Sequence, residues 1–220
     1  MDVRINAAQL IEKEAARKRP GKVFISSVSD GWQPLEEKYL LTRQCLEVLL
    51  KHNYAINIQT KSALVQRDFD LIKGHSNVEL GMTLTTIEPK VAALFEPKAS
   101  TPDKRIEVLN RANEIGIRTF VFLGPLLPYI SDRGKGLRDL FDAVVKINPD
   151  YFFVDRLNPR YGMWPTVSAT LAKYDSKLIP EYRKILYDRQ MRECYTRELR
   201  QRVREQVKQY GLISKVRLCF

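Results

Sequence analysis

The feature that most constrains the fold is a regular alternation of short apolar runs with longer amphipathic stretches. The apolar runs predict strands at Val23–Ser26, Ala55–Gln59, Asn77–Leu84, Arg118–Leu123 and Asp150–Val154. The amphipathic stretches predict helices at Asn6–Arg19, Glu36–His52, Ala63–Lys73, Pro89–Phe95, Asp103–Ile115 and Gly136–Ile147. Strands that alternate with helices at roughly 30-residue spacing are typical of βαβ units. The pattern therefore predicts an α/β fold with a parallel sheet and right-handed crossovers, and five such units favour an open or partial barrel over a closed eight-stranded one.

The C-terminal quarter of the chain has a different pattern. Residues 165–210 show helical periodicity without a strand pattern, and the apolar residues Tyr195, Leu199, Val203 and Val207 recur every four positions. The sequence thus predicts a barrel domain over residues 1–164 and a helical C-terminal extension over residues 165–220.

The composition indicates in which compartment the protein is expected and which partners it is not expected to have. The chain has 220 residues, 44% of them hydrophobic, which suffices for a real core. No run of about 18 apolar residues occurs, so no membrane partner is expected, and residues 1–20 lack the apolar core of a secretion signal. We therefore expect a cytoplasmic protein.

The charge is strongly basic. A net charge of +11 favours polyanionic partners, nucleic acid first, although a basic protein with merely solvated charges has the same composition. Arg189, Arg192, Arg200 and Arg204 add positive charge to the C-terminal segment. Two interpretations of this segment stay open: a helix that faces nucleic acid, or a charged helix held by its apolar stripe.

Polar residues gather where the predicted strands end. The first strand runs into Ser26, Ser27, Ser29 and Asp30, followed by Gly31. Later strands end at Thr60-Lys61-Ser62, Thr83–Thr86, Pro125–Asp132 and Asp155-Arg156. Because the carboxyl ends of parallel strands meet at one edge, these loops are expected to form the ligand site.

The cysteines do not suggest a metal site. Cys45, Cys194 and Cys219 lie far apart, and no CxxC, CxxxCxxC or Cys/His cluster occurs. A structural zinc or an iron–sulfur cluster held by this chain alone is therefore not expected, and the cysteines are interpreted as buried or incidental thiols.

Three segments together carry a family resemblance: SDGWQPLEEKYLLTR (29–43), TKSALVQRDFDLI (60–72) and FEPKASTPDKRIEVLNRANEIGIRTFVFLGPLLPYISD (95–132). In order and spacing they resemble the spore photoproduct lyase-like branch of the radical S-adenosylmethionine enzymes. The resemblance covers about residues 3–160. It implies a partial (β/α)6-type TIM-like barrel, with S-adenosylmethionine bound across the strand tops beside a [4Fe–4S] cluster that cleaves it reductively. A complete enzyme of this kind would need a reductant protein.

The resemblance also implies roles for particular residues. Ser27, Ser29 and Asp30 stand where family members contact the methionine amino group, and Lys61 stands where an ammonium could meet the methionine carboxylate. Thr83 and Thr85 could bind ribose. Gly124, Pro125 and Leu126 lie where the later strand edges the adenine. Arg67-Asp68 and Arg105 look like residues that brace loops, with Glu96 as a partner of one of them.

One departure from the family is decisive for activity. The family's CxxxCxxC loop, expected just upstream of Val3–Asn6, is absent, and Asp30-Gly31-Trp32 replaces the usual Asp-Pro-Tyr. The first strand and the cluster loop are thus expected to be missing. Either the chain is a truncated form of a normal enzyme, or it is a relative without a cluster that serves another role.

Three functions remain open at this stage. The first is the barrel portion of a radical S-adenosylmethionine enzyme that is inactive alone. Its catalytic residues and substrate are unknown, and nucleic acid is a candidate substrate. The second is a degenerate barrel that binds nucleic acid or protein. The third is a conventional barrel enzyme that uses Asp30, Lys61 and Asp155 as acid–base or imine-forming groups.

Overall fold

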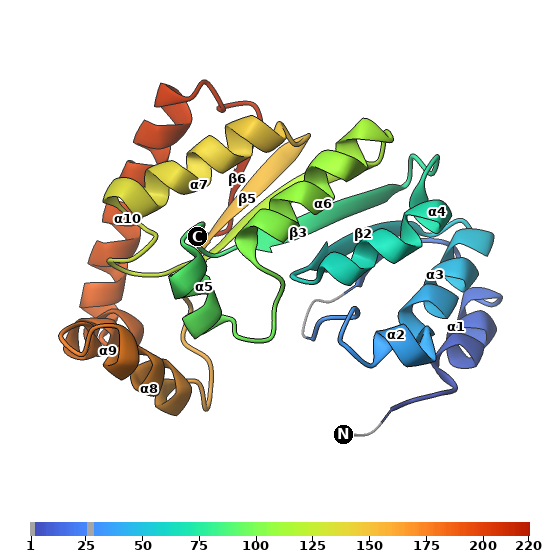
Figure 1. Ribbon diagram of the computed structural model, residues 1–220, viewed down its shortest axis with the longest axis horizontal. Coiled ribbons are helices and arrows are strands. Elements are labelled where there is room, and N and C mark those ends of the chain that lie inside the picture. Colours follow the sequence, from blue (N-terminus) through green and yellow to red (C-terminus); the bar gives the residue numbers. More distant parts are fainter. Residues whose placement is uncertain (1–2, 26–28) are drawn as a thin grey trace.

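The sheet contains six parallel strands that follow one another in chain order. The computed structural model describes residues 3–25 and 29–220, and its strands pair in the order β1-β2-β3-β4-β5-β6, without closing into a full barrel (Figure 1). The strands are β1 (Lys22–Ile25), β2 (Ala55–Thr60), β3 (Val78–Leu84), β4 (Arg118–Leu126), β5 (Tyr151–Arg156) and β6 (Val216–Leu218). The predicted α/β class and the partial TIM-like barrel are therefore confirmed.

Helices connect the strands and continue beyond the fifth one. Those within the βα series are α1 (Ala7–Ala15), α2 (Glu36–Tyr39), α3 (Leu41–Lys51), α4 (Phe69–Ile72), α5 (Pro89–Phe95), α6 (Pro102–Glu114) and α7 (Gly134–Ile147), with a 3-10 turn η1 (Ala63–Asp68) before α4. The C-terminal helices are α8 (Trp164–Tyr174), α9 (Leu178–Tyr187) and α10 (Arg189–Gln209). In Figure 1, α6 and α7 lie across the front of the sheet and α10 runs along its left side. Among the described helices, none is long and apolar enough to span a bilayer.

One predicted helix is in fact two. The stretch Glu36–His52 divides at Leu40, whose φ is 52°, into α2 and α3. The cause is the buried Glu36 side chain, whose carboxylate accepts bonds from the backbone N–H groups of Thr42 (3.0 Å) and Arg43 (3.2 Å). A carboxylate that accepts these N–H groups caps the start of a new helix, so periodicity alone gave the wrong boundary.

One strand boundary and one strand also differ from the prediction. The sequence predicts that the fourth strand ends at Leu123, but β4 continues through Gly124 and Pro125 to Leu126, because pairing resumes between Leu126 and Arg156 after an irregularity. The short strand β6 was not predicted. It has three residues and pairs with β5, so its pattern is too short to be recognised in the sequence.

The helix-covered face of the sheet contains the main core. Ile56, Ile58, Leu80, Val121 and Val154 are fully buried on this face. The apolar stripe of α10 joins the same core, with its four members Tyr195, Leu199, Val203 and Val207 buried. The predicted packing of α10 by its apolar stripe is therefore confirmed.

The opposite face, called here the inner face, alternates with the core positions along each strand. At its base Glu79 of β3 accepts bonds from Asn57 (3.1 Å) and the Tyr151 hydroxyl (2.9 Å), and forms ion pairs with Lys22 and Arg118 (3.2 Å each). One carboxylate thus links strands β1 to β5 at the end remote from the predicted site.

Aromatic rings form the middle of the inner face. Phe120 stacks on Tyr151 with ring centroids 5.3 Å apart, and Phe153 meets both rings edge-on. Gly81 lies beneath the Phe120 ring, where a Cβ atom would lie 2.1 Å from Phe120 Cζ. The neighbouring strand therefore has to carry a glycine here.

Candidate ligand-binding site

The candidate site lies at the mouth, defined here as the edge where strands β1 to β5 end. All five strands run parallel, so their carboxyl ends lie at this edge. The polar residues that follow β1, β2 and β3 are joined by hydrogen bonds and ion pairs described below. Ser27, one of the predicted site residues, lies outside the described residues.

Asp30 ties the loop after β1 to the end of β2. Its carboxylate accepts bonds from the Thr60 hydroxyl (2.7 Å), the Lys61 backbone N–H (2.8 Å) and the Trp32 backbone N–H (3.0 Å). Neighbouring Ser29 is exposed. Asp30 is thus at the mouth as predicted, but much of its acceptor capacity holds the loop in place.

A buried ion-pair group braces this loop from below. The Trp32 indole N–H donates to Asp68 (2.8 Å), which also pairs with Arg67 (2.8 Å) and Arg43 (3.1 Å). Trp32 and Asp68 are both buried. The predicted bracing role of Arg67-Asp68 is therefore confirmed.

Glu96 organises the next part of the mouth. The group of Lys61, Thr85, Glu96 and Arg105 is called here the Glu96 cluster. Glu96 lies 3.4 Å from Lys61 Nζ and 2.7 Å from an Arg105 nitrogen, and it accepts a 2.8 Å bond from the Thr85 hydroxyl. The predicted pairing of Glu96 with a bracing arginine is confirmed for Arg105.

Arg105 is fixed from several sides. It is 1% exposed, and it donates to the backbone carbonyls of Thr83 (2.9 Å) and Ser100 (2.7 Å) in addition to its ion pair with Glu96. A planar guanidinium presents five donors on three nitrogens in a fixed fork, whereas an ammonium has three donors on a single nitrogen. The loop after α5 is thereby attached to the end of β3.

The two predicted ribose residues differ in their bonding. The Thr83 hydroxyl accepts a bond from the Gln59 amide (3.1 Å), which leaves its own proton for another acceptor. The Thr85 hydroxyl donates to Glu96 and lies 3.2 Å from the Gly124 carbonyl. Only Thr83 therefore keeps its hydroxyl proton for a further partner.

The β4 residues frame the far side of the mouth. A Cβ atom on Gly124 would lie 2.7 Å from the Phe122 ring and 3.2 Å from Asp155 Cβ, so a glycine is needed where β4 passes β5. Pro125 is partly exposed, whereas Leu126 is fully buried. Of the three predicted adenine residues, Leu126 thus lies within the core.

Asp155 is a mouth residue that the resemblance did not include. Burial raises the pKa of its carboxyl, although the Arg156 backbone N–H and the Asn158 side chain favour the charged form. The sequence signal for it was its place at the end of the fifth strand. Thr60 was expected at the mouth as the first residue of the polar end of the second strand, but Gln59 was not in the predicted set and could have been found from its polar side chain one position earlier.

The cysteines do not form a cluster site. In the described part of the chain no group of His, Cys, Asp and Glu residues is arranged to hold a metal ion. Cys45 is half-buried in α3, and burial raises its thiol pKa, while Cys194 and Cys219 are exposed. The residues present therefore do not fit a [4Fe–4S] cluster.

Comparison with known proteins defines the fold class. Spore photoproduct lyase, solved with bound S-adenosylmethionine and a dinucleoside spore photoproduct, superposes with a TM-score of 0.69, over 99% of this chain and 67% of that chain, at 13% identity. A second structure, a complex of the lyase with a dinucleoside spore photoproduct, gives a TM-score of 0.67 at 13% identity. The fold is thus that of the radical S-adenosylmethionine enzymes.

Relatives found by sequence are uncharacterised. A protein of Methanocaldococcus jannaschii is 36% identical over 130 residues, which is 59% of this chain and 49% of that protein. A protein of Acidianus two-tailed virus is 32% identical over 160 residues, 70% of this chain and 52% of that protein. The chain spans about half the length of these relatives. No family model matches the sequence.

Proposed function

We propose that this chain is the barrel portion of a radical S-adenosylmethionine enzyme and that it binds S-adenosylmethionine at the mouth. The observation that carries the proposal is the continuous set of polar contacts from Asp30 through Lys61 and the Glu96 cluster to Thr83 and Gly124. A zwitterionic sulfonium nucleoside needs a cation, acceptors and hydroxyl groups within one small region, and this edge of the sheet offers all three.

Each mouth residue has a part in this proposal. Lys61 would meet the methionine carboxylate, because its side chain is 37% exposed and its ion pair with Glu96 is 3.4 Å long. Ser27, Ser29 and Asp30 would accept bonds from the amino group. The ribose would favour Thr83 over Thr85, whose proton is already used. The backbone at Gly124 and Pro125 would edge the adenine.

The described residues do not supply the ligands of an iron–sulfur cluster. A [4Fe–4S] cluster would deliver the electron that cleaves S-adenosylmethionine, and its thiolate ligands would have to come from outside the described residues. We therefore expect the 220-residue chain to bind S-adenosylmethionine without cleaving it, and the substrate of the whole protein stays open.

Equilibrium dialysis with labelled S-adenosylmethionine tests the binding. Lys61→Met should weaken binding about tenfold, the effect of losing roughly 1.4 kcal/mol. Lys146→Met is the matched control, since Lys146 is an exposed lysine near the C-terminus of α7 and removes the same charge. Equal affinities for both variants, or no binding by the unchanged chain, would contradict the proposal.

Anaerobic iron–sulfur reconstitution tests the enzyme class separately. The 220-residue chain should take up no stoichiometric cluster, and a version extended upstream by the sequence encoded there should take up one. If the extended version also binds no iron, the chain is not part of a cluster enzyme, even if it binds S-adenosylmethionine.

A second candidate function is nucleic-acid binding by the barrel without a cluster. It is favoured by the net charge of +11 and by the unpaired cations of α10 described next. One measurement distinguishes the two candidates, namely the affinity for nucleic acid with and without S-adenosylmethionine. A module that only binds nucleic acid would have the same affinity in both conditions.

A further inference from the structure

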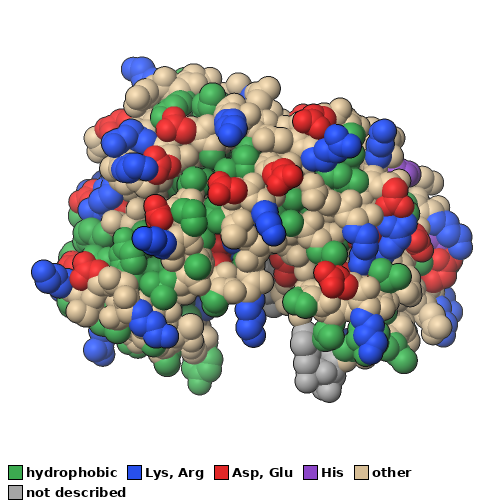
Figure 2. All heavy atoms as spheres, in the orientation of Figure 1, with side chains coloured by type: hydrophobic (Ala, Val, Ile, Leu, Met, Phe, Trp, Pro, Cys, Tyr) green, Lys and Arg blue, Asp and Glu red, His purple; other side chains and the backbone are tan. Residues whose placement is uncertain are grey.

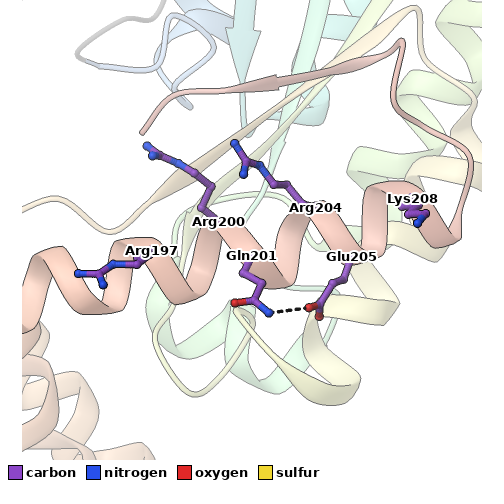
Figure 3. A pocket seen from close by; sticks show the side chains of 6 residues that line it. All are labelled: Arg197, Arg200, Gln201, Arg204, Glu205 and Lys208. Atoms are coloured by element: carbon purple, nitrogen blue, oxygen red, sulfur yellow. Dashed lines mark hydrogen bonds between the residues drawn. The ribbon is translucent and has the colours of Figure 1, made fainter.

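One exposed face of α10 carries four cations in a row. Arg197, Arg200, Arg204 and Lys208 line a shallow groove of about 550 Å³ together with Gln201 and Glu205 (Figure 3). At 100° per residue the four cations fall within a sector of about 80° that flanks the buried stripe of Tyr195, Leu199, Val203 and Val207. These four cations are called here the basic stripe.

The cations of the basic stripe are not neutralised by the protein. Within residues 3–25 and 29–220, no ion pair joins Arg197, Arg204 or Lys208 to an acid, and Arg200 contacts only the Phe220 ring, at 5.9 Å. The acids of α10 are engaged elsewhere. Glu193 pairs with Arg189, Glu198 pairs with Arg202, and Glu205 accepts a 3.0 Å bond from Gln201.

Such an arrangement lowers helix stability unless a partner compensates. Like charges three and four residues apart repel on a helix surface. On the face seen in Figure 2, by contrast, Lys and Arg side chains are interspersed with Asp and Glu. The basic stripe is thus a local feature and not a consequence of the net charge alone.

The stripe lies beside the open edge of the barrel. Figure 3 shows Arg200 and Arg204 pointing from α10 toward the segment that contains β6. Strand β6 is the edge strand next to β5, and the exposed Arg217 of β6 covers Tyr151 on the inner face at 3.8 Å. A chain of phosphates bound along α10 would therefore pass next to the rim of the inner face.

We propose that the basic stripe of α10 binds the sugar–phosphate backbone of a nucleic acid. From Arg197 to Lys208 the helix rises about 16 Å at 1.5 Å per residue. Phosphates of one strand are about 3.4 Å apart along a duplex axis, so the stripe spans about four or five of them. Charge complementarity with a regularly spaced polyanion fits this length, and no sequence preference is expected from phosphate contacts alone.

The inference does not depend on S-adenosylmethionine binding, so the test omits that ligand. Fluorescence anisotropy follows a fluorescein-labelled 15-nucleotide single strand and the matching duplex, titrated with the full chain from 50 to 200 mM salt. For the single strand the logarithm of affinity should fall with the logarithm of salt with a slope near −3, because four contacts contribute about 0.7 each.

The test variant is R197Q/R204Q/K208Q, which removes three exposed cations. It should flatten the single-strand slope by about 2 and weaken binding at least about tenfold at 50 mM salt. The matched control K13Q/K104Q/K146Q removes three exposed lysines from α1, α6 and α7 and should bind nearly as the unchanged chain does. Circular dichroism melting confirms that each variant is folded, and the single substitutions R204Q and K208Q serve if the triple variant is not.

Three results would overturn the proposal. The first is an equal loss of binding in the two triple variants, which would indicate that net charge alone is responsible. The second is absence of binding by the unchanged chain at 50 mM salt. The third is binding of anionic phospholipid vesicles in place of either oligonucleotide.

Discussion

Glu79 offers a sharp test of how the open sheet is held together. Replacing it by glutamine keeps the shape of the side chain and removes the charge that Lys22, Arg118, Asn57 and Tyr151 share. The two cations are about half-exposed, so each ion pair contributes at most about 1 kcal/mol. The hydrogen bonds from Asn57 and Tyr151 become neutral ones, a loss of about 1 kcal/mol together. We expect Glu79→Gln to lower the free energy of unfolding by about 1–3 kcal/mol.

The pH dependence of this effect has a defined sign. Burial opposes the charge on Glu79, but the bonds from Tyr151, Asn57 and Lys22 outweigh it and lower the pKa of the carboxyl below its ordinary value of 4.5. A lowered folded-state pKa contributes stability that is present above pH 4.5 and is lost as the pH falls through the folded-state value. The difference between the unchanged chain and Glu79→Gln should therefore shrink between pH 6 and pH 3.

Urea denaturation at several pH values measures this difference. Glu114→Gln is the control, because Glu114 is exposed and pairs only with Arg111 on the same helix, so its loss should cost less than about 0.5 kcal/mol. An ultraviolet titration gives a second readout. Burial, with the bond and the charge of Glu79, raises the pKa of Tyr151 to about 12, and the Glu79→Gln variant should lower it. A cost equal to that of Glu114→Gln, or one constant down to pH 3, would refute the reasoning.

Three further predictions concern packing, the mouth and the sheet edge. Gly81→Ala should destabilise the fold by about 1–3 kcal/mol in urea denaturation, because its Cβ would enter the Phe120 ring, and Phe120→Leu should restore part of the loss in the double variant. Arg105→Met should cost about 3–5 kcal/mol, because it leaves the largely buried Glu96 carboxylate, 11% exposed, and the Thr83 carbonyl without this donor. Arg105→Lys should recover little of the loss, and an unchanged melting temperature would contradict this prediction. Phe24 is 60% exposed on the edge strand β1, so we expect the chain to self-associate. Light scattering should detect this association, and Phe24→Lys should reduce it. A monodisperse monomer with a high melting temperature would count against this prediction.

The sequence predicted five of the six strands because their helix-covered residues form apolar runs. Val78–Leu84 and Arg118–Leu123 are buried almost throughout, which produces the continuous pattern of a parallel strand. The predicted boundaries of helices and strands were wrong where a side chain or a neighbouring strand determines the boundary. Glu36 divides one predicted helix by capping α3, and β5 extends β4 beyond Leu123 by pairing with Leu126. Neither partner can be identified from local periodicity.

The sequence predicted where the candidate site lies, but not the hydrogen bonds and ion pairs within it. The residue types that follow each strand located the mouth, since parallel strands bring their carboxyl ends to one edge. Which polar atoms remain for a ligand depends on partners far along the chain. Asp30 is held by Thr60, thirty positions away, and Thr85 by Glu96. Thr83 and Thr85 look alike in sequence, yet only Thr83 keeps its proton.

This division of the polar atoms determines how the mouth can be tested. Replacing Asp30 would release the Thr60 hydroxyl and the Lys61 and Trp32 backbone N–H groups, so ligand binding would fall whether or not Asp30 touches a ligand. Within residues 3–25 and 29–220, the Lys61 side chain has a single long ion pair and takes part in no bond that holds the backbone. A loss of affinity at Lys61 with unchanged stability therefore reports a direct contact, whereas a loss at Asp30 reports the loop.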